Sequence, residues 1–298
     1  MAIMSSPSPS AARTTSSHPR IVLVIALTSL AVACCTLLAT ASLAAPQPGE
    51  RGEQSAETFQ TTFTSVDAVL AAQWDFPAQS PAPLVVIIPG GGAIDRNGWR
   101  SGLGEDPDDG IYAQLTRELV KRGFAVFRYD KPGAGRSGRG RYATERSNAI
   151  EAYTRAVDHG RVDPDRVYLL GHTIGTDTIA GIYPRFTAVT PPAGAVLLDS
   201  MVGETASLRI DAPVLIVNAS DPDDKTLYGS FVVEARARDK EHALETELVI
   251  IEGRDGILTR VERGDEVSIS LDPRARDAVL RWLMEHRAPL GRSAALNR

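Results

Sequence analysis

Short, uninterrupted runs of apolar residues recur along the chain and predict a buried β-sheet. Each run is bounded by glycine, proline or polar residues, which is typical of strands buried on both faces. The predicted buried strands are Leu84–Ile88, Phe124–Tyr129, Val167–Leu170, Ala193–Leu198, Val214–Val217 and Leu248–Ile251. Two earlier segments, Thr58–Val66 and Val69–Phe76, predict strands that open the domain.

Segments with helical spacing of apolar residues lie between these strands. The predicted helices are Ile111–Arg122, Ala149–His159, Ile174–Tyr183 and Pro273–His286, and Val162–Asp165 is predicted to be a turn. Strands that alternate with helices indicate an α/β fold with a mostly parallel central sheet and helices on both faces. Ligands bind such sheets beyond the carboxyl ends of the strands. The glycine-rich loops of this chain fall at those ends.

The first 45 residues predict an export segment. Arg13 and Arg20 are its only charged side chains, and Ile21–Ala45 runs for 25 residues without a charge. A basic start followed by an apolar core is typical of a signal peptide. Small residues at Ser42–Ala44 fit a cleavage site.

Two other interpretations of this segment stay open. Cys34 follows Leu30–Ala33 and is a candidate for lipidation, and an uncleaved anchor is the other possibility, because about 20 apolar residues span a bilayer. All three place the folded part outside the cytoplasm, as a secreted, periplasmic or envelope-attached protein, with membrane contact only through this segment. We predict a signal peptide or anchor at 1–45, a flexible linker at 46–57, the folded domain at 58–290 and a tail at 291–298.

Composition narrows the possible functions. Hydrophobic residues make up 43% and charged residues 23% of the 298 residues, as in folded globular proteins. The net charge is -5 and no basic block is present, so nucleic acid is not an expected partner. The only cysteines are Cys34 and Cys35, which excludes a disulfide framework and a cysteine nucleophile in the folded domain. We expect no metal and no cofactor.

One glycine motif places a hydroxyl between a strand and a helix. Gly171–Gly175 reads G-x-T-x-G, and the related G-x-S-x-G is a nucleophile elbow. Its sharp turn would lift the Thr173 hydroxyl above the sheet, close to backbone N–H groups that can hold an oxyanion. Two further loops accompany it, Pro89–Gly98 (PGGGAIDRNG) and Arg128–Ser137 (RYDKPGAGRS).

With these three motifs, residues 58–290 resemble the α/β-hydrolase family, in particular its esterase- and peptidase-like members. The resemblance implies an α/β-hydrolase fold in which Thr173 is the nucleophile. It also implies an oxyanion hole made by the N–H groups of Gly91 and Ile174. The candidate pocket residues on the loops are Gly90, Gly92, Asp95, Arg96, Asp130 and His172.

Several of these residues have a structural interpretation beside the functional one. The glycines of Gly90–Gly92 also suit a tight turn without chemistry. Arg96 is expected to pair with Asp95 or with Asp130, and Asp130 and Ser137 are expected to brace their own loop. His172 is expected to be a packed or capping histidine. Adjacent side chains at an elbow point apart, so it is not expected to serve Thr173 as a base.

Two departures from the family pattern concern the chemistry. Threonine replaces serine at the elbow, and its β-branched side chain is stiff and crowds a tight turn. In the loop after the last buried strand, Gly256 stands where the family has its catalytic histidine. The five histidines are His18, His159, His172, His242 and His286, and none lies in that loop. A hydroxyl without a base stays protonated and is a poor nucleophile.

The identity of the acidic residue of a catalytic triad also stays open. Asp221 or Asp223 follows the strand Val214–Val217 in a suitable place, although the segment also reads as an Asp- and Pro-rich turn. A metal-assisted reaction through this cluster is disfavoured, because no histidine joins it at ligand spacing.

The lid predicted from the sequence is small. Only about a dozen residues separate the strands on either side of Asp199–Asp211. Trp99 and Tyr112 are candidates to line the opening. Two functions therefore remain. One is hydrolysis of carboxylic esters or small amides by Thr173. The other is a non-catalytic relative that binds a small molecule or an envelope partner through the same pocket.

Overall fold

The computed structural model describes residues 56–98, 109–141, 143–220, 232, 235–236, 245–252, 258–263 and 267–288. All of them belong to a compact unit that spans 50–298. The predictions for the export segment with Cys34, most of the linker and the tail lie outside the described residues. So do those for Trp99, Asp221, Asp223 and Gly256.

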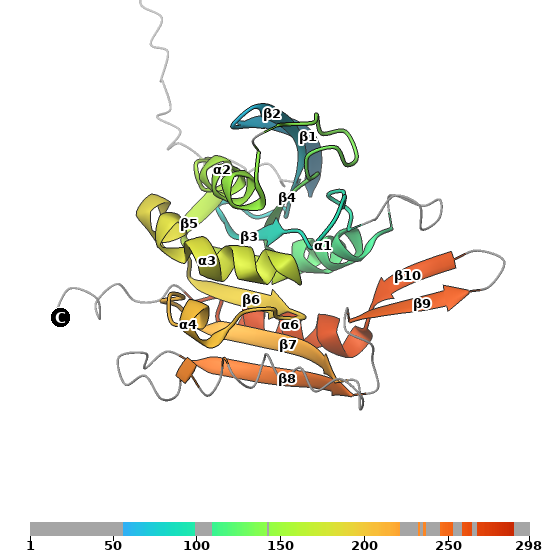
Figure 1. Cartoon of the computed structure of the whole chain (residues 1–298), viewed down its shortest axis with the longest axis vertical. Helices are drawn as coiled ribbons and strands as arrows, with labels where there is room; N and C mark the ends of the chain where they lie inside the picture. Colours follow the sequence, from blue (N-terminus) through green and yellow to red (C-terminus); the bar gives the residue numbers. More distant parts are fainter. Residues whose placement is uncertain are drawn as a thin grey trace, which may run out of the picture. The chain divides into compact units, whose positions relative to one another are not determined.

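The main sheet has eight strands within the described part of the chain, in the order β1-β2-β4-β3-β5-β6-β7-β8 (Figure 1). Their bounds are β1 Glu57–Ser65, β2 Ala68–Phe76, β3 Ala82–Ile88, β4 Ala125–Tyr129, β5 Val162–His172, β6 Gly194–Leu198, β7 Val214–Ser220 and β8 Thr246–Glu252. Strand β2 pairs antiparallel with β1 and with β4, and the pairs from β4 to β8 are parallel. The predicted mostly parallel sheet is confirmed.

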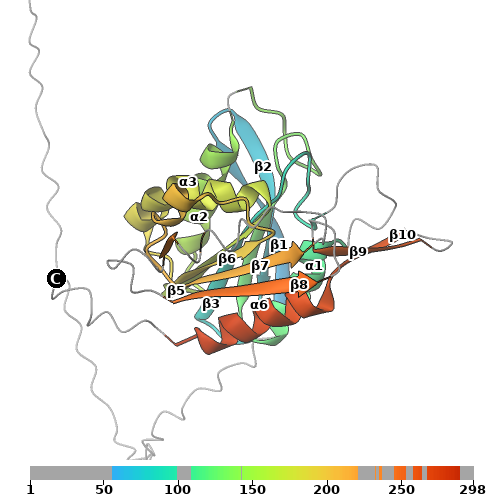
Figure 2. The same cartoon turned by 60° about the horizontal axis from the view of Figure 1, so that its bottom comes forward.

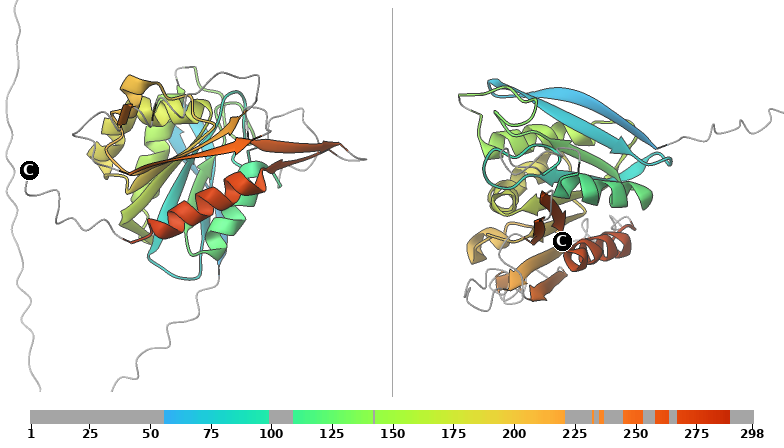
Figure 3. Two further views of the ribbon diagram at one scale, coloured as in Figure 1. Left: turned by 90° about the horizontal axis from the view of Figure 1, so that it is seen from below. Right: turned by 90° about the vertical axis from the view of Figure 1, so that its right-hand side faces the viewer.

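Helices cover both faces of this sheet, as Figures 2 and 3 show. Helices α2 (Glu145–Val157) and α3 (Ile174–Val189) lie on one face, and α1 (Ile111–Lys121) and α6 (Pro273–Glu285) lie on the other. Successive strand residues serve opposite faces: Leu84 and Val86 pack in the α2–α3 core, whereas Val85 and Ile87 pack in the α1–α6 core. This explains why the strands read as continuous apolar runs.

Several element boundaries differ from the predictions for local reasons. Helix α2 begins at Glu145 instead of Ala149, because Thr144 caps it with a capping box. Helix α3 continues past Tyr183 through Pro184, with a non-helical backbone at Ile182. The predicted turn at 162–165 is instead the start of β5. Strands β9 (Thr259–Arg263) and β10 (Val267–Leu271), which form a separate antiparallel pair, were not predicted.

The segment between β6 and β7 is short, as expected for a small lid. Its only helix is α4 (Glu204–Ser207), a single turn. No helix within the described ranges is long and apolar enough to cross a membrane.

Candidate functional site

The elbow between β5 and α3 has a strained backbone at its central residue. Thr173 has φ +48° and ψ -116°, a region that β-branched residues rarely adopt. Its N–H donates to the Leu198 carbonyl at 2.9 Å, and its own carbonyl accepts from the Thr176 N–H at 2.9 Å. These hydrogen bonds fix the turn at the carboxyl ends of β5 and β6.

The flanking glycines allow the strand, the helix and a neighbouring loop to approach closely. A Cβ on Gly175 would lie 2.3 Å from the Ile88 carbonyl oxygen, and one on Gly171 would lie 2.8 Å from the Ile179 side chain. Real Cβ atoms do not come this close to their neighbours. The G-x-T-x-G spacing is therefore required by packing, whatever chemistry occurs at Thr173.

The half-buried Thr173 side chain faces the loop after β3. The Gly91 N–H donates to the Thr173 hydroxyl oxygen over an N···O distance of 3.3 Å. Ile174 is the first residue of α3, and N–H groups in the first turn of a helix have no partner within the helix. Of the two N–H groups expected to form an oxyanion hole, that of Gly91 contacts the hydroxyl, and that of Ile174 belongs to the first residue of the helix that follows it.

Gly90 is held in place by two buried side chains that the sequence analysis did not single out for this role. Its N–H donates to the Tyr112 hydroxyl at 2.9 Å, and its carbonyl accepts from Lys131 Nζ at 2.8 Å. Lys131 also pairs with Glu145 at the start of α2. Helix α1 and the loop after β4 together position the residue before the Gly91 donor.

Tyr112 also contacts His172. The pKa of Tyr112 is raised well above its usual value of 10 by burial, so its hydroxyl keeps its proton. Because the hydroxyl oxygen accepts from Gly90, its proton is available to His172 Nδ1, 3.0 Å away. His172 Nδ1 is thereby engaged with Tyr112.

This arrangement changes two expectations. Tyr112 is 2% exposed and lies beneath the loop, so it does not line the opening. His172 is a buried, packed residue at 5% exposure, as expected. Tyr112 was missed because its place in the apolar pattern of α1 looked like ordinary core, and Lys131 because nothing in its loop indicated a long-range contact.

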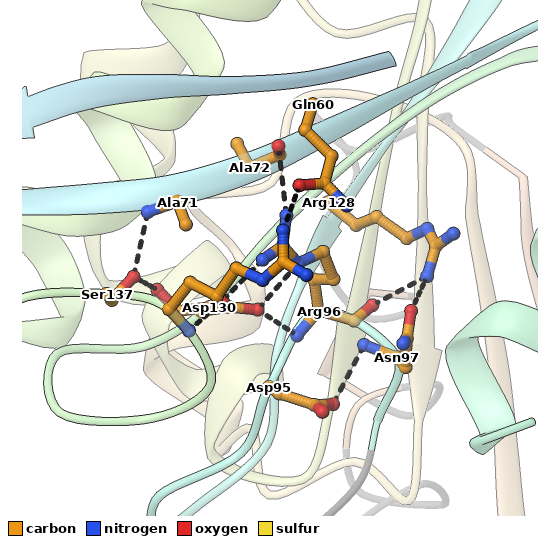
Figure 4. Close-up of polar contacts among 10 residues, drawn as sticks. Gln60, Ala71, Ala72, Asp95, Arg96, Asn97, Arg128, Asp130 and Ser137 are labelled. Atoms are coloured by element: carbon orange, nitrogen blue, oxygen red, sulfur yellow. Dashed lines mark hydrogen bonds and ion pairs between the residues drawn. The ribbon is translucent and has the colours of Figure 1, made fainter. Parts of the chain in front are cut away.

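Arg96 and Asp130 form a buried ion pair that joins the loop after β3 to the loop after β4 (Figure 4). Arg96 Nε and Nη2 donate to the two carboxylate oxygens of Asp130 at 2.9 and 2.8 Å, and the Arg96 N–H adds a bond of 2.7 Å. Both side chains are less than a tenth exposed. Of the two predicted partners, Arg96 pairs with Asp130, whereas Asp95 accepts from the Asn97 N–H.

The loop after β4 is braced as predicted. The Arg136 N–H donates to Asp130 at 2.7 Å. The Ser137 hydroxyl donates to the Asp130 carbonyl at 2.7 Å and accepts from the Ala71 N–H at 2.9 Å. A Cβ on Gly135, whose φ is +49°, would lie 2.4 Å from the carboxylate. These contacts give Arg96 and Asp130 a structural role, setting the position of the loop that carries Gly91.

The other described histidines are engaged elsewhere in the fold. The ring of His159 packs among Trp74 and Phe76, and burial together with the positive charge of Arg161 lowers its pKa. His286 stacks on Trp282 at the end of α6. Among the described residues, no histidine hydrogen-bonds to Thr173, and no group of three or more His, Cys, Asp and Glu side chains is arranged to hold a metal.

Asp199 is an acidic residue next to the elbow whose place at the site was not predicted. It follows β6, the strand paired with β5, and the register places His172 opposite Leu198. Its φ is +49°, and its N–H donates to the Val217 carbonyl at 2.8 Å. The half-buried Asp199 therefore lies at the same sheet edge as Thr173.

Comparison with known proteins agrees with this arrangement. Residues 101–220 match the sequence profile of the serine aminopeptidase S33 family. A dienelactone hydrolase-like promiscuous phosphotriesterase from metagenomic libraries is similar with a TM-score of 0.58 at 14% identity, over 78% of this chain and 100% of that one. A bacterial heroin esterase has a TM-score of 0.52 at 14% identity, over 80% of this chain and 87% of that one.

A third similar structure is the esterase LipW from Mycobacterium marinum, with a TM-score of 0.52 at 16% identity, over 78% of this chain and 83% of that one. A search of curated protein sequences finds no match. The strand order and the elbow after β5 agree with these likenesses. This chain therefore has the α/β-hydrolase fold.

Proposed function

We propose that this chain is an exported hydrolase of small carboxylic esters or amides, with the Thr173 hydroxyl as its nucleophile. The observation that carries the proposal is the backbone of Thr173, at φ +48° and ψ -116°. Such strain costs about 1–3 kcal/mol and persists mainly at functional sites. A β-branched residue kept in this conformation supports a use for its hydroxyl.

The proposed reaction is acyl transfer. Thr173 Oγ1 attacks the ester carbonyl, its proton passes to a base, and the N–H groups of Gly91 and Ile174 hold the oxyanion. The carbon–oxygen bond to the alcohol then breaks as the alcohol takes up a proton, and water hydrolyses the acyl-threonine. The Gly91 N–H that now donates to Thr173 would turn to the oxyanion.

We assign the base to a carboxylate. Asp199 is the described candidate at this sheet edge, and Asp221 and Asp223 are the candidates outside the described residues. A carboxylate has a pKa near 4, against about 6.5 for histidine, so it takes a hydroxyl proton less readily. The proposal therefore includes slow turnover.

The alternative function is binding without turnover, as a small-molecule-binding or envelope interaction protein. It is favoured by one observation: His172 Nδ1 is occupied by Tyr112, and no other described histidine reaches Thr173. The strained elbow and its N–H donors would then hold a carbonyl or carboxylate group of a ligand.

Hydrolysis of p-nitrophenyl acetate by the full-length chain separates the two functions. We expect slow turnover that falls in Thr173→Ala to the rate of hydrolysis in buffer alone. The control is Thr187→Ala, the same change at an exposed position of α3, and in this variant turnover should persist. An acetyl group on Thr173, found by mass spectrometry, would identify the nucleophile. Turnover unchanged in Thr173→Ala would rule out the acyl mechanism.

Export rests on the apolar segment 21–45 and has its own test. Intact mass after expression in a bacterial host separates a cleaved chain from a lipidated or a full-length one. Substitution Cys34→Ala should remove the mass of the lipid if Cys34 carries one, leave the mass of a chain cleaved after residue 34 unchanged, and lower the mass of a full-length chain only by that of the side-chain sulfur atom. A full-length chain recovered from the cytoplasm would contradict export.

A further inference from the structure

One peptide unit joins Lys131 to the elbow. The carbonyl of Gly90 and the N–H of Gly91 belong to the same peptide, which is trans. The carbonyl accepts from Lys131 Nζ at 2.8 Å, and the N–H donates to Thr173 Oγ1 at 3.3 Å. A trans peptide is planar, and its C=O and N–H groups point in opposite directions. Lys131 and Thr173 therefore contact the two ends of one rigid unit.

The residues of this peptide do not fix its orientation by themselves. Glycine has no Cβ and accepts a wide range of backbone dihedral angles. A peptide between Gly90 and Gly91 can therefore turn over at little steric cost, which would point its N–H away from Thr173. Contacts with other parts of the fold must determine which way the Gly91 N–H points.

Lys131 supplies the contact on the carbonyl side. Its side chain is 5% exposed, and its ammonium group contacts both the Gly90 carbonyl and the Glu145 carboxylate. The Lys131 N–H donates to the Ile94 carbonyl at 3.2 Å, which ties the backbone of Lys131 to the loop after β3. A hydrogen bond from a cation is stronger than one between neutral groups, and burial reduces its screening by water.

Tyr112 holds the preceding peptide in the same way. The Gly90 N–H donates to the Tyr112 hydroxyl at 2.9 Å, so two successive peptides are held by buried side chains. If the Gly90–Gly91 peptide turned over, the buried ammonium of Lys131 would lose an acceptor, which is unfavourable. The two contacts together favour the orientation in which the Gly91 N–H faces Thr173.

We propose that Lys131 is a positioning residue of the oxyanion hole. It holds the Gly90–Gly91 peptide with its N–H toward Thr173, and its charge on the carbonyl oxygen polarises the peptide, which makes the N–H a stronger donor. The role in catalysis rests on the proposed function, because an oxyanion forms only if Thr173 attacks a carbonyl. The orientation and polarisation of the peptide do not depend on turnover and can be measured separately.

Nuclear magnetic resonance of the full-length chain can observe this N–H directly. The only Gly–Gly bonds in the sequence are Gly90–Gly91 and Gly91–Gly92. Glycine labelled with carbon-13 at its carbonyl and with nitrogen-15 therefore selects two N–H signals by the coupling across these bonds. Thr173→Ala removes the hydroxyl that the Gly91 N–H contacts, so the signal that moves in this variant is that of Gly91.

We expect Lys131→Met to move the Gly91 proton signal upfield, because the loss of the cation weakens the polarisation and frees the peptide to turn. Lys121→Met is the matched control, the same change at a lysine of α1 whose side chain is 69% exposed. It should leave the Gly91 signal in place. Unfolding in urea checks that each variant is folded.

Glu145→Gln tests the same charge without changing Lys131. Its side chain is 41% exposed, and glutamine keeps its size, so this variant serves even if Lys131→Met does not fold. Removing the negative charge beside Lys131 leaves the positive charge less neutralised. We therefore expect the Gly91 proton signal to move downfield, opposite to its movement in Lys131→Met.

Hydrolysis of p-nitrophenyl acetate tests the catalytic consequence. In Lys131→Met we expect kcat to fall at least about tenfold, since loss of an oxyanion donor typically costs about 100-fold or more. KM should stay within about twofold of its value in the unmodified chain, because the oxyanion exists only in the transition state. Lys121→Met should change neither constant.

Three results would overturn the proposal. They are a Gly91 signal that moves no further in folded Lys131→Met than in Lys121→Met, a signal that does not move downfield in Glu145→Gln, and an unchanged kcat in Lys131→Met when the unmodified chain turns over. If the unmodified chain has no turnover, the proposed function fails, and the Gly91 signal alone decides the role of Lys131.

Discussion

Gly90, in the loop after β3, lies close to the elbow. A Cβ there would lie 2.7 Å from Thr173 Oγ1 and 3.3 Å from His172 Nδ1. Gly90→Ala must therefore displace the Thr173 side chain or the loop, and either shift disturbs the Gly91–Thr173 hydrogen bond. We expect the free energy of unfolding to fall by about 1–3 kcal/mol, as for other overpacked sites, and any ester turnover to fall with it.

Gly160→Ala is the matched control for this residue, because a Cβ at Gly160 would meet nothing within 4 Å. Chemical unfolding of both variants in urea checks the prediction. Equal stability of the two alanine variants would mean that the loop moves freely and that Gly90 does not position the donor.

At the scale of elements, the N-terminus of α2 depends on one side chain. The Ser147 N–H donates to Thr144 Oγ1 at 3.2 Å, and the Thr144 N–H donates to Ser147 Oγ at 2.7 Å. Thr144→Ala removes the cap, so we expect a loss of about 1 kcal/mol in unfolding free energy. Thr154→Ala, an exposed change within α2, should cost less. A smaller loss at Thr144 than at Thr154, measured by urea unfolding, would contradict this prediction.

The elements that the sequence predicts are those whose signal is local. The buried strands are continuous apolar runs, so their pattern alone identifies them, and the glycines of 171–175 locate Thr173 and Ile174. The pair β9–β10 is short and mixes charged with apolar residues, so its pattern is weak. Continuation of α3 past Pro184 is set by packing and not by local preference.

The supporting residues of the site could not be predicted for a related reason. Tyr112 contacts Gly90 and His172 only because α1 packs against the sheet, and Lys131 reaches Gly90 across 41 positions of sequence. Asp199 adjoins the elbow because β6 pairs with β5. Contacts between segments far apart in the chain have no local pattern, whereas the elbow does.

At the scale of the whole molecule, His159 links the antiparallel end of the sheet to the segment after α2. Its ring lies 4.7 Å from that of Trp74 and 4.8 Å from that of Phe76. Burial, and then Arg161 and Arg155, lower its pKa below 6.5 in the folded chain. The unfolded chain therefore binds more protons as the pH falls through about 6.5, and the contribution of His159 to stability is present above this pH and is lost below it.

Replacing His159 with phenylalanine keeps an aromatic ring in the cluster and removes the titration. We expect His159→Phe and the unmodified chain to have the same melting temperature at about pH 7.5. When the pH is lowered to about 5.5, where most carboxylates remain charged, the melting temperature of His159→Phe should fall less than that of the unmodified chain. The comparison at the higher pH controls for packing, since only a proton-linked effect grows with acidity. Melting temperatures that fall in parallel for the two chains would show that His159 has the same affinity for protons in the folded and unfolded states, and that this end of the sheet does not sense pH through it.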